Sequence, residues 1–289
     1  MLGRTIPYLA LLCFVSAGCL SSEHGPTEPE PDPVVPGIVV FVSDRDESHG
    51  EIYSMRDDGT NVRRLTFNSV VDRAPVLSPD GTKILFRREL NPDNVFVMNV
   101  NGTGQAGLAP GTRAEWSPDG TEIALVTVTD TLCVMNADAT GKRSLGVGAE
   151  FVAWSPDGAK LAYVSTGLAG QAVNDIYTIA PNGTGALRIT SDGAAKNSLA
   201  WSPDGTKLVY GAPQGVHVIP AQGGAPESPS PGHHPRWSPD GTRVIFVTDT
   251  YNGGGDDDVY TILLDGTGLE NLSHHEAAES DPDWGPRRP

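Results

Sequence analysis

Short apolar runs of five or six residues recur along the chain from residue 37 onward, and turn-forming residues separate them. Runs of this length that are rich in Val, Ile, Phe and Tyr are typical of β-strands and are too short for ordinary buried helices. One set lies at residues 38–43, 83–88, 122–127, 160–165, 207–212 and 243–248, and a second set lies at 51–55, 94–98, 131–135, 175–179, 215–219 and 258–262. The pattern therefore predicts an all-β protein.

A four-residue motif, Ser-Pro-Asp-Gly, precedes five runs of the first set. These residues suit the four successive positions of a type I turn, so we interpret the motif as a turn between two strands and not as a catalytic Ser or Asp. The copies begin at Ser78, Ser117, Ser155, Ser202 and Ser238, and each follows a large apolar residue, namely Leu77, Trp116, Trp154, Trp201 or Trp237. A degenerate sixth copy spans residues 283–286, and successive copies are 36–47 residues apart, which is close to the period of propeller blades.

The second set of runs ends in Asx-Gly pairs such as Asp58-Gly59, which favour hairpin turns, and a weaker fourth strand follows. Residues 37–289 are therefore predicted to form a six-bladed β-propeller with four antiparallel strands per blade. The first unit lacks an initial strand, whereas residues 281–284 supply one with nothing after it. We expect this C-terminal strand to pair with the N-terminal strands and close the ring, because closure removes exposed sheet edges.

The pattern Trp-Ser-Pro-Asp-Gly-Thr-Lys-Ile/Leu, followed by Ile-Tyr-x-Met/Ile-x-x-Asp-Gly, resembles the TolB-type, WD-repeat-like β-propeller repeat over residues 37–286. The resemblance implies a six-bladed propeller. TolB proteins carry an α/β domain ahead of the propeller, and we expect none here because residues 1–36 have other features. Similar propellers precede the hydrolase domain of prolyl oligopeptidase-like peptidases, but the hydrolase signature Gly-x-Ser-x-Gly does not occur in this sequence.

The first 36 residues predict export and a membrane anchor. One basic residue, an apolar run at 6–15 and small residues before Cys19 resemble a bacterial lipoprotein signal, which implies a signal peptide at 1–18 and a lipid on Cys19. An ordinary cleaved signal with an incidental Cys is the alternative. Residues 19–36 are Pro-rich and acidic and are predicted to be an extended tether. Because Leu20 follows the Cys, the resemblance implies the outer membrane, facing the periplasm.

The net charge of the chain argues against some classes of binding partner. The chain has 20 basic and 36 acidic residues, a net charge of −16, so its surface repels phosphate backbones and anionic lipids. We therefore expect no nucleic-acid partner, and membrane contact only through the lipid on Cys19. Cys133 is the one cysteine after residue 36, and we interpret it as a buried apolar residue and not as a nucleophile.

Polar pairs at alternate positions precede the turn motif in three units. The pairs are Arg113 with Glu115, His234 with Arg236, and Asp281 with Asp283. They lie on predicted innermost strands near one end of the central channel, the end that carries the irregular loops. Two interpretations stay open: a structural ring of ion pairs between blades, or a ligand-binding mouth.

Histidine and acidic clusters provide weak candidates for a metal site, namely His233, His234, His274, His275, Asp256 and Asp258. Imidazoles suit transition metals and carboxylates suit Ca²⁺, but no complete ligand spacing is present. Solvated, charged loops are the alternative, and we predict no cofactor.

These features favour a lipid-anchored envelope propeller that binds a protein or glycan partner through its irregular loops, without catalysis. The alternative function is a metal-assisted lyase or hydrolase acting on an envelope or extracellular polysaccharide, with a metal held by the His clusters. The sequence does not decide between these two functions.

Overall fold

The computed structural model describes residues 37–46, 49–251 and 256–285. The predicted signal peptide, Cys19 and the tether lie outside the described residues. Among the described residues, no helix has the length and hydrophobicity needed to cross a bilayer. In the part of the chain that the structure describes, the secondary structure is strands apart from one turn of 3-10 helix, η1 (Leu168–Gly170), so the prediction of an all-β protein is confirmed.

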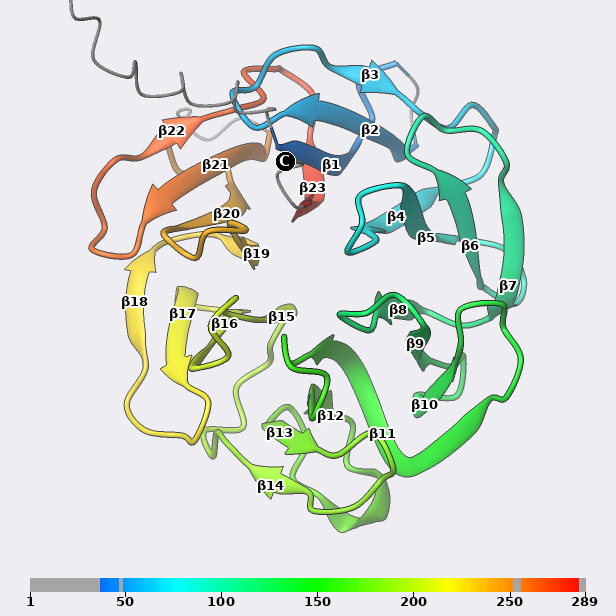
Figure 1. Cartoon of the computed structure of the whole chain (residues 1–289). Helices are drawn as coiled ribbons and strands as arrows, with labels where there is room; N and C mark the ends of the chain where they lie inside the picture. The colour runs from blue at the N-terminus through cyan, green and yellow to red at the C-terminus, as the bar shows by residue number, and fades with distance from the viewer. Residues whose placement is uncertain (1–36, 47–48, 252–255, 286–289) are drawn as a thin grey trace, which may run out of the picture. The chain divides into compact units, whose positions relative to one another are not determined.

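Four sheets are four-stranded antiparallel meanders arranged around a common centre (Figure 1). The first contains β23 (Glu279–Trp284), β1 (Ile38–Ser43), β2 (Glu51–Arg56) and β3 (Arg63–Arg64), and the second contains β4 (Asp72–Leu77), β5 (Lys83–Arg88), β6 (Asn94–Asn99) and β7 (Ala106–Pro110). The third contains β15 (Ser198–Trp201), β16 (Lys207–Ala212), β17 (Gly215–Pro220) and β18 (Glu227–Ser230), and the fourth contains β19 (His233–Trp237), β20 (Arg243–Thr248), β21 (Asp258–Leu263) and β22 (Glu270–Asn271).

The prediction of six four-stranded blades is wrong. The described residues form four such blades, and the intervening segment forms one seven-stranded sheet. In spatial order this sheet contains β14 (Leu187–Arg188), β13 (Ile176–Ile179), β12 (Leu161–Ser165), β11 (Arg143–Trp154), β10 (Thr131–Asn136), β9 (Glu122–Val126) and β8 (Arg113–Trp116).

The physical reason for this difference is the unbroken strand β11, which is 12 residues long. Its first half pairs with β10 and its second half pairs with β12. At the other junctions a loop separates the outermost strand of one sheet from the innermost strand of the next. No loop interrupts β11: Gly148 pairs with Thr131 of β10, and the next residue, Ala149, pairs with Ser165 of β12.

Closure of the ring by the C-terminal strand is confirmed. Strand β23 pairs antiparallel with β1, with Val39 opposite Trp284 and Val40 opposite Asp283. Figure 1 shows β23 lying between β1 and the centre. The two ends of the described chain therefore complete one sheet, and its inner edge is not exposed as it would be in an open meander.

The Ser-Pro-Asp-Gly motif forms the predicted turn. In the first copy the Ser78 hydroxyl donates to Asp80 Oδ1 at 2.6 Å, and Gly81 N donates to Ser78 O at 2.8 Å. The same Ser-to-Asp hydrogen bond of 2.6 Å recurs in the other four copies. The Ser and Asp side chains are thus used to hold the turn, as the sequence predicted.

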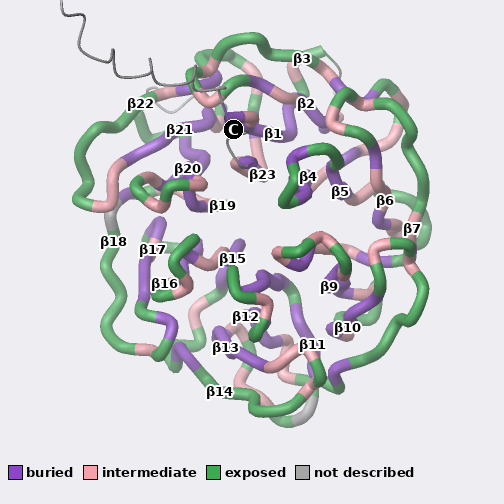
Figure 2. The backbone as a smooth tube through the Cα atoms, viewed as in Figure 1, coloured by how far each residue is buried: buried purple, intermediate pink, exposed green. Residues whose placement is uncertain are grey.

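The residue before each turn packs between neighbouring sheets. Trp116 belongs to a cluster with Leu85 and Val95 of the preceding sheet and with Ile123 and Leu125 of its own. Comparable clusters surround Trp154 and Trp237, and Figure 2 shows buried residues along strands such as β1 and β20 and exposed residues at many of the turns. Apolar packing between sheets fixes where the inner strands begin and end, and so it positions the candidate site.

Candidate functional site

The innermost strands bring the predicted polar residues together at one end of the ring. A cavity of about 30 Å³ lies there, lined by the residue three positions before the packing residue of each inner strand, namely Ala74, Arg113, Phe151, Ser198, His234 and Asp281. We call this cavity the mouth cavity. Its volume suits one or two water molecules. The polar side chains therefore fill most of the space between the inner strands at this end.

Arg113 lies at the mouth cavity beside an aromatic ring. Its guanidinium carbon is 5.0 Å from the centre of the Phe151 ring, and Nη1 donates to Thr112 O at 2.9 Å. Burial lowers the pKa of Arg113, and attraction to Asp281 opposes that effect. A guanidinium remains charged even so, and stacking on an aromatic face compensates part of the lost hydration.

His234 on β19 and Asp281 on β23 belong to neighbouring sheets. The distance between His234 Nε2 and Asp281 Oδ1 is 3.7 Å. Burial lowers the pKa of His234 to about 4, against the attraction of Asp281. Burial acts to raise the pKa of Asp281, but neighbouring cations, His234 and Arg113 above all, hold it below its usual value. Because the pKa of His234 is about 4, the imidazole is neutral at pH 7, and the charges of Arg113 and Arg236 stabilise the Asp281 carboxylate under those conditions.

A second polar layer lies two residues further along the inner strands. Arg236 donates from Nη1 to Leu199 O at 3.0 Å, and its Nε is 3.6 Å from Asp283 Oδ1. Asp283 also accepts a hydrogen bond of 2.8 Å from Leu77 N. Burial raises the pKa of Asp283, and it raises the pKa of Glu115 to about 8, in both cases against the attraction of Arg236. Glu115 therefore carries the proton at pH 7, and Asp283 is the partner of Arg236.

The two layers together contain all six predicted residues. Asp283, Glu115 and Arg236 also line a cavity of about 270 Å³ on the other side of the second layer, where indole rings surround them. The predicted pairing of Arg236 with Asp283 is present at 3.6 Å. These six side chains therefore come from separate sheets and lie close together at one end of the ring. Both interpretations of the sequence, an ion-pair ring and a ligand-binding mouth, require this arrangement.

Three residues that line the mouth cavity have positive φ. Ala74, His234 and Asp281 have φ values of 51°, 51° and 49°, and each lies where the pairing register of its strand shifts. Positive φ is uncommon for residues other than Gly and persists only where the surrounding structure enforces it. Each of the three precedes a proline. This Xaa-Pro pattern is a signal that the sequence analysis did not use.

The metal candidates do not gather into one group. His233 Nε2 contacts Asp257 Oδ2 at 3.0 Å, and His233 Nδ1 lies 3.1 Å from His234 Nδ1. His275 instead donates its backbone N–H to Asp258 Oδ1 at 3.4 Å. Within residues 37–46, 49–251 and 256–285, no group of three or more His, Cys, Asp or Glu side chains is arranged to hold a metal ion. His274 and Asp256 complete the candidate set, and they join no such group.

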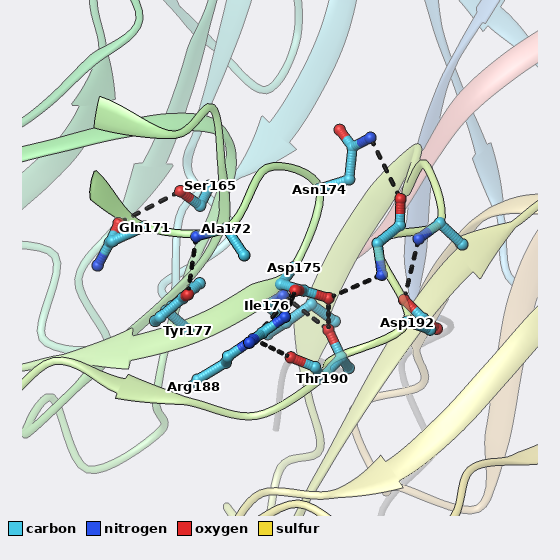
Figure 3. A network of polar contacts seen from close by, with 12 residues as sticks. Ser165, Gln171, Ala172, Asn174, Asp175, Ile176, Tyr177, Arg188, Thr190 and Asp192 are labelled. Carbon is cyan, nitrogen blue, oxygen red and sulfur yellow. Dashed lines mark hydrogen bonds and ion pairs between the residues drawn. The ribbon is translucent and has the colours of Figure 1, made fainter. Parts of the chain in front are cut away.

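Three buried carboxylates lie at the start of the third strand of a unit, and sequence reasoning named only Asp258 among them, as a weak metal candidate. Asp175 is an example, and Figure 3 shows it between Arg188 and Thr190. Asp175 Oδ2 accepts from Arg188 Nε at 3.0 Å, and Oδ1 accepts from the Thr190 hydroxyl at 3.1 Å and from Gly193 N at 3.2 Å. The carboxylate thus ties a third strand to the fourth strand and to the loop that follows.

The same arrangement recurs at Glu51 with Thr66 and at Asp258 with Ser273, in each case across 15 positions of sequence. This repeated spacing is the signal that would have found these residues. Because all three carboxylates are satisfied by neighbouring side chains, we interpret them as supports for the loops around the mouth cavity and not as binding residues.

A closed ring of radially arranged antiparallel sheets is a β-propeller. No protein-family model matches the chain. A TolB homologue from Chlorobium luteolum is 32% identical over 142 residues, which is 44% of this chain and 31% of that protein. The matched part therefore spans about a third of the curated relative.

Solved structures show a similar fold over most of this chain. TolB from Acinetobacter baumannii has a TM-score of 0.74 at 18% identity, covering 86% of this chain and 67% of that one. A TolB-like structure from Agrobacterium tumefaciens has a TM-score of 0.63 at 18% identity, covering 88% and 99%. An oligogalacturonate lyase in complex with manganese has a TM-score of 0.53 at 15% identity, covering 78% and 85%. The chain has the β-propeller fold of these structures, and the resemblance of its repeats to those of TolB proteins is confirmed.

Proposed function

We propose that this chain is an exported, lipid-anchored propeller of the cell envelope that binds a protein or glycan partner, without catalysis, at the mouth cavity. The observation that carries the proposal is the convergence of Arg113, His234 and Asp281, from separate sheets, around one opening, where His234 and Asp281 have positive φ. Charged groups fixed by a rigid scaffold are suited to recognise complementary polar groups on a partner. The likeness to TolB proteins supports an envelope role.

The mouth cavity itself is too small for a sugar ring or a side chain of ordinary size, since its volume is about 30 Å³. The partner therefore lies over the opening and contacts the polar side chains from outside. His234 and Asp281 reach the surface, with 24% and 15% of their side chains exposed. The loops that the buried carboxylates hold provide the surrounding contact area.

The anchor is proposed from the sequence. A lipid on Cys19 and a tether at 19–36 would hold the propeller at the outer membrane, facing the periplasm. Cys19→Ser should convert a detergent-soluble, lipid-labelled protein into a water-soluble one. A Cys19→Ser variant that still partitions with membranes would contradict the anchor and leave the binding proposal open.

Crosslinking in whole cells, followed by capture, tests the binding site. Arg113→Met and Asp281→Asn should each abolish recovery of the partner, because each removes a charge at the opening. Asp265→Asn is the matched control, since Asp265 is an exposed turn residue whose hydrogen bonds to Thr267 an Asn can keep. Equal recovery from all variants would contradict the proposal.

The metal-assisted lyase or hydrolase alternative requires His233, His234, His274 and His275 to converge. In the structure His233 and His234 face Asp257 and Asp281, whereas His275 contacts Asp258. Metal analysis of the purified protein separates the two functions. A stoichiometric transition metal that is lost in His233→Ala would favour the alternative.

A further inference from the structure

A second opening lies at the other end of the inner strands, on the face that carries the Ser-Pro-Asp-Gly turns. It is a groove of about 660 Å³ between the β4–β7 sheet and the β8 edge of the seven-stranded sheet. Grooves lined by the equivalent turns occur at two other junctions, and their volumes are about 350 Å³ and 340 Å³. This junction is therefore more open than those two, since its groove has nearly twice their volume.

The first cause of this opening is Ala139. At the equivalent turn position other units have Gly59, Gly102, Gly183 and Gly223, all with positive φ. A Cβ on these glycines would lie only 2.4, 2.6, 3.1 and 3.2 Å from a backbone oxygen of the preceding sheet's fourth strand or the residue that follows it. Ala139 has the same backbone conformation, with φ 66°, but it carries the Cβ. Its turn must therefore stand away from β7.

The consequence is visible at Leu108, which occupies the fourth-strand position that Leu65, Leu145, Ile189 and Leu272 occupy elsewhere. Those four side chains are buried, with exposures of 6%, 6%, 7% and 2%. Leu108 is only partly buried, and it lines the groove.

Ala137 adds to this opening. Val100 and Leu264 occupy the equivalent position in two other units, two residues before the turn glycine, and both pack against their core clusters. Another unit has Ala221 there, so a small residue at this position is not by itself unusual. Ala137 packs against its core cluster and lines the groove, and its small side chain leaves space that a Val or Leu would fill. The turn at Ala139 together with the small Ala137 thus leaves apolar surface uncovered at this junction.

The groove has an apolar floor and an acidic rim. Val97, Leu108, Trp116 and Ala137 form the floor. The rim contains Asp80, Asp119 and Asp138 against one cation, Lys83. Hydrogen bonds from Ser117 and Thr121 lower the pKa of Asp119, and hydrogen bonds from Thr140 lower the pKa of Asp138, so both are ionised at neutral pH.

We propose that this groove binds an extended peptide segment of a partner protein in which apolar side chains alternate with Lys or Arg. Uncovered apolar surface with a charged rim is typical of recognition sites, and the rim selects a partner of opposite charge. The net charge of the chain, −16, adds a long-range attraction for such a segment. This surface is at the opposite end of the inner strands from the mouth cavity, so the two proposals stand independently.

Fluorescence anisotropy with two labelled peptides tests the proposal. The probes are a seven-residue peptide in which Lys alternates with Leu, and the same peptide with Glu in place of Lys. The Lys peptide should bind saturably and the Glu peptide should not. Ala137→Leu and Ala139→Gly each install the residue of a sister unit, and each should weaken binding by about tenfold or more because the groove fills or closes. Leu264→Ala, at the equivalent position of another unit, is the matched control and should leave the affinity unchanged.

The charge of the rim is tested separately. Asp119→Asn with Asp138→Asn keeps the turn hydrogen-bond acceptors, should lower the affinity by about tenfold at low salt, and should reduce its salt dependence. Arg113→Met, at the mouth cavity, should have no effect on peptide binding. Removal of residues 286–289 tests occupancy by this chain's own basic end, and unchanged affinity supports an external partner.

Three results would overturn the proposal. These are absence of saturable binding of the Lys peptide, equal binding by folded Ala137→Leu and Ala139→Gly, and a tenfold gain in affinity after removal of residues 286–289. Circular dichroism of each variant establishes that it is folded. Failure of the mouth-cavity proposal would leave these measurements unaffected.

Discussion

The hydroxyl of Ser43 donates a hydrogen bond of 3.2 Å to Glu279 Oε1 across 236 positions of sequence. Arg45 Nη2 donates to the same oxygen at 2.7 Å. These bonds connect the end of β1 with the start of β23, where the last strand enters the first sheet. The closure of the ring therefore combines backbone pairing with a buried carboxylate.

Removal of residues 279–289 should destabilise the protein severely, because it deletes the inner strand of the first sheet and exposes the edge of β1. The expected loss is comparable with the whole unfolding free energy, about 5–15 kcal/mol for a typical protein. Urea unfolding followed by circular dichroism measures it. A chain lacking only residues 286–289 is the control, and an equal effect of both truncations would contradict the role of β23.

Trp154→Ala should cost about 3–5 kcal/mol, because Trp154 is 92% buried between neighbouring strands in a core cluster. Its indole N–H has no hydrogen-bond partner among the described residues, so Trp154→Phe should cost far less. Leu187→Ala, at an exposed position, should change the stability by under about 0.5 kcal/mol. Thermal unfolding of the three variants checks the order.

Asp175→Asn should destabilise the fold by about 3–5 kcal/mol, because it leaves Arg188 and Thr190 without their buried carboxylate. Amide hydrogen exchange should also increase in the loop after β14, including Gly193, whose N–H donates to Asp175. Asp265→Asn, in an exposed turn, is the control. Unchanged exchange at Gly193 would show that the carboxylate does not hold the loop.

Stability should fall as the pH rises from about 5 to about 8. The pKa of Glu115 is raised from 4.5 to about 8, so the folded state binds a proton that the unfolded state has released. The contribution is complete below the unfolded pKa and is lost as the pH approaches the folded pKa. Each pKa unit corresponds to about 1.4 kcal/mol, so Glu115→Gln should be more stable than the native protein at pH 8 by at least that amount. Urea midpoints at pH 5, 6.5 and 8 test this, and parallel curves for both proteins would contradict it.

The contribution of His234 to stability depends on pH in the opposite direction. Its pKa is lowered from 6.5 to about 4, so the folded state favours neutral imidazole, and stability is lost as the pH falls from about 6.5 to about 4. The expected loss is on the order of 1–3 kcal/mol. NMR titration of the imidazole measures the pKa directly. His234→Gln should remove this part of the acid dependence, and an NMR pKa near 6.5 would contradict the buried, neutral imidazole.

The repeats alone determined the all-β fold, the turns, the packing of Trp116 and its counterparts, and the pairing of the last strand with the first. These features could be predicted because strand length, turn chemistry and repeat period are local properties of the sequence, and each copy of the repeat shows them. The candidate residues Arg113, His234 and Asp281 could also be placed near one opening, since their distance from each packing residue fixes their depth along the inner strands.

Tertiary structure decided the rest. The unbroken β11 joins what the repeats predict as separate blades, because hydrogen bonding across Gly146-Val147-Gly148-Ala149 depends on both neighbouring strands. The proton on Glu115 depends on burial beside Arg236, and the open groove at Ala139 depends on how closely a turn can approach another sheet. These are properties of contacts between segments far apart in sequence, so the pattern of any single repeat contains no information about them.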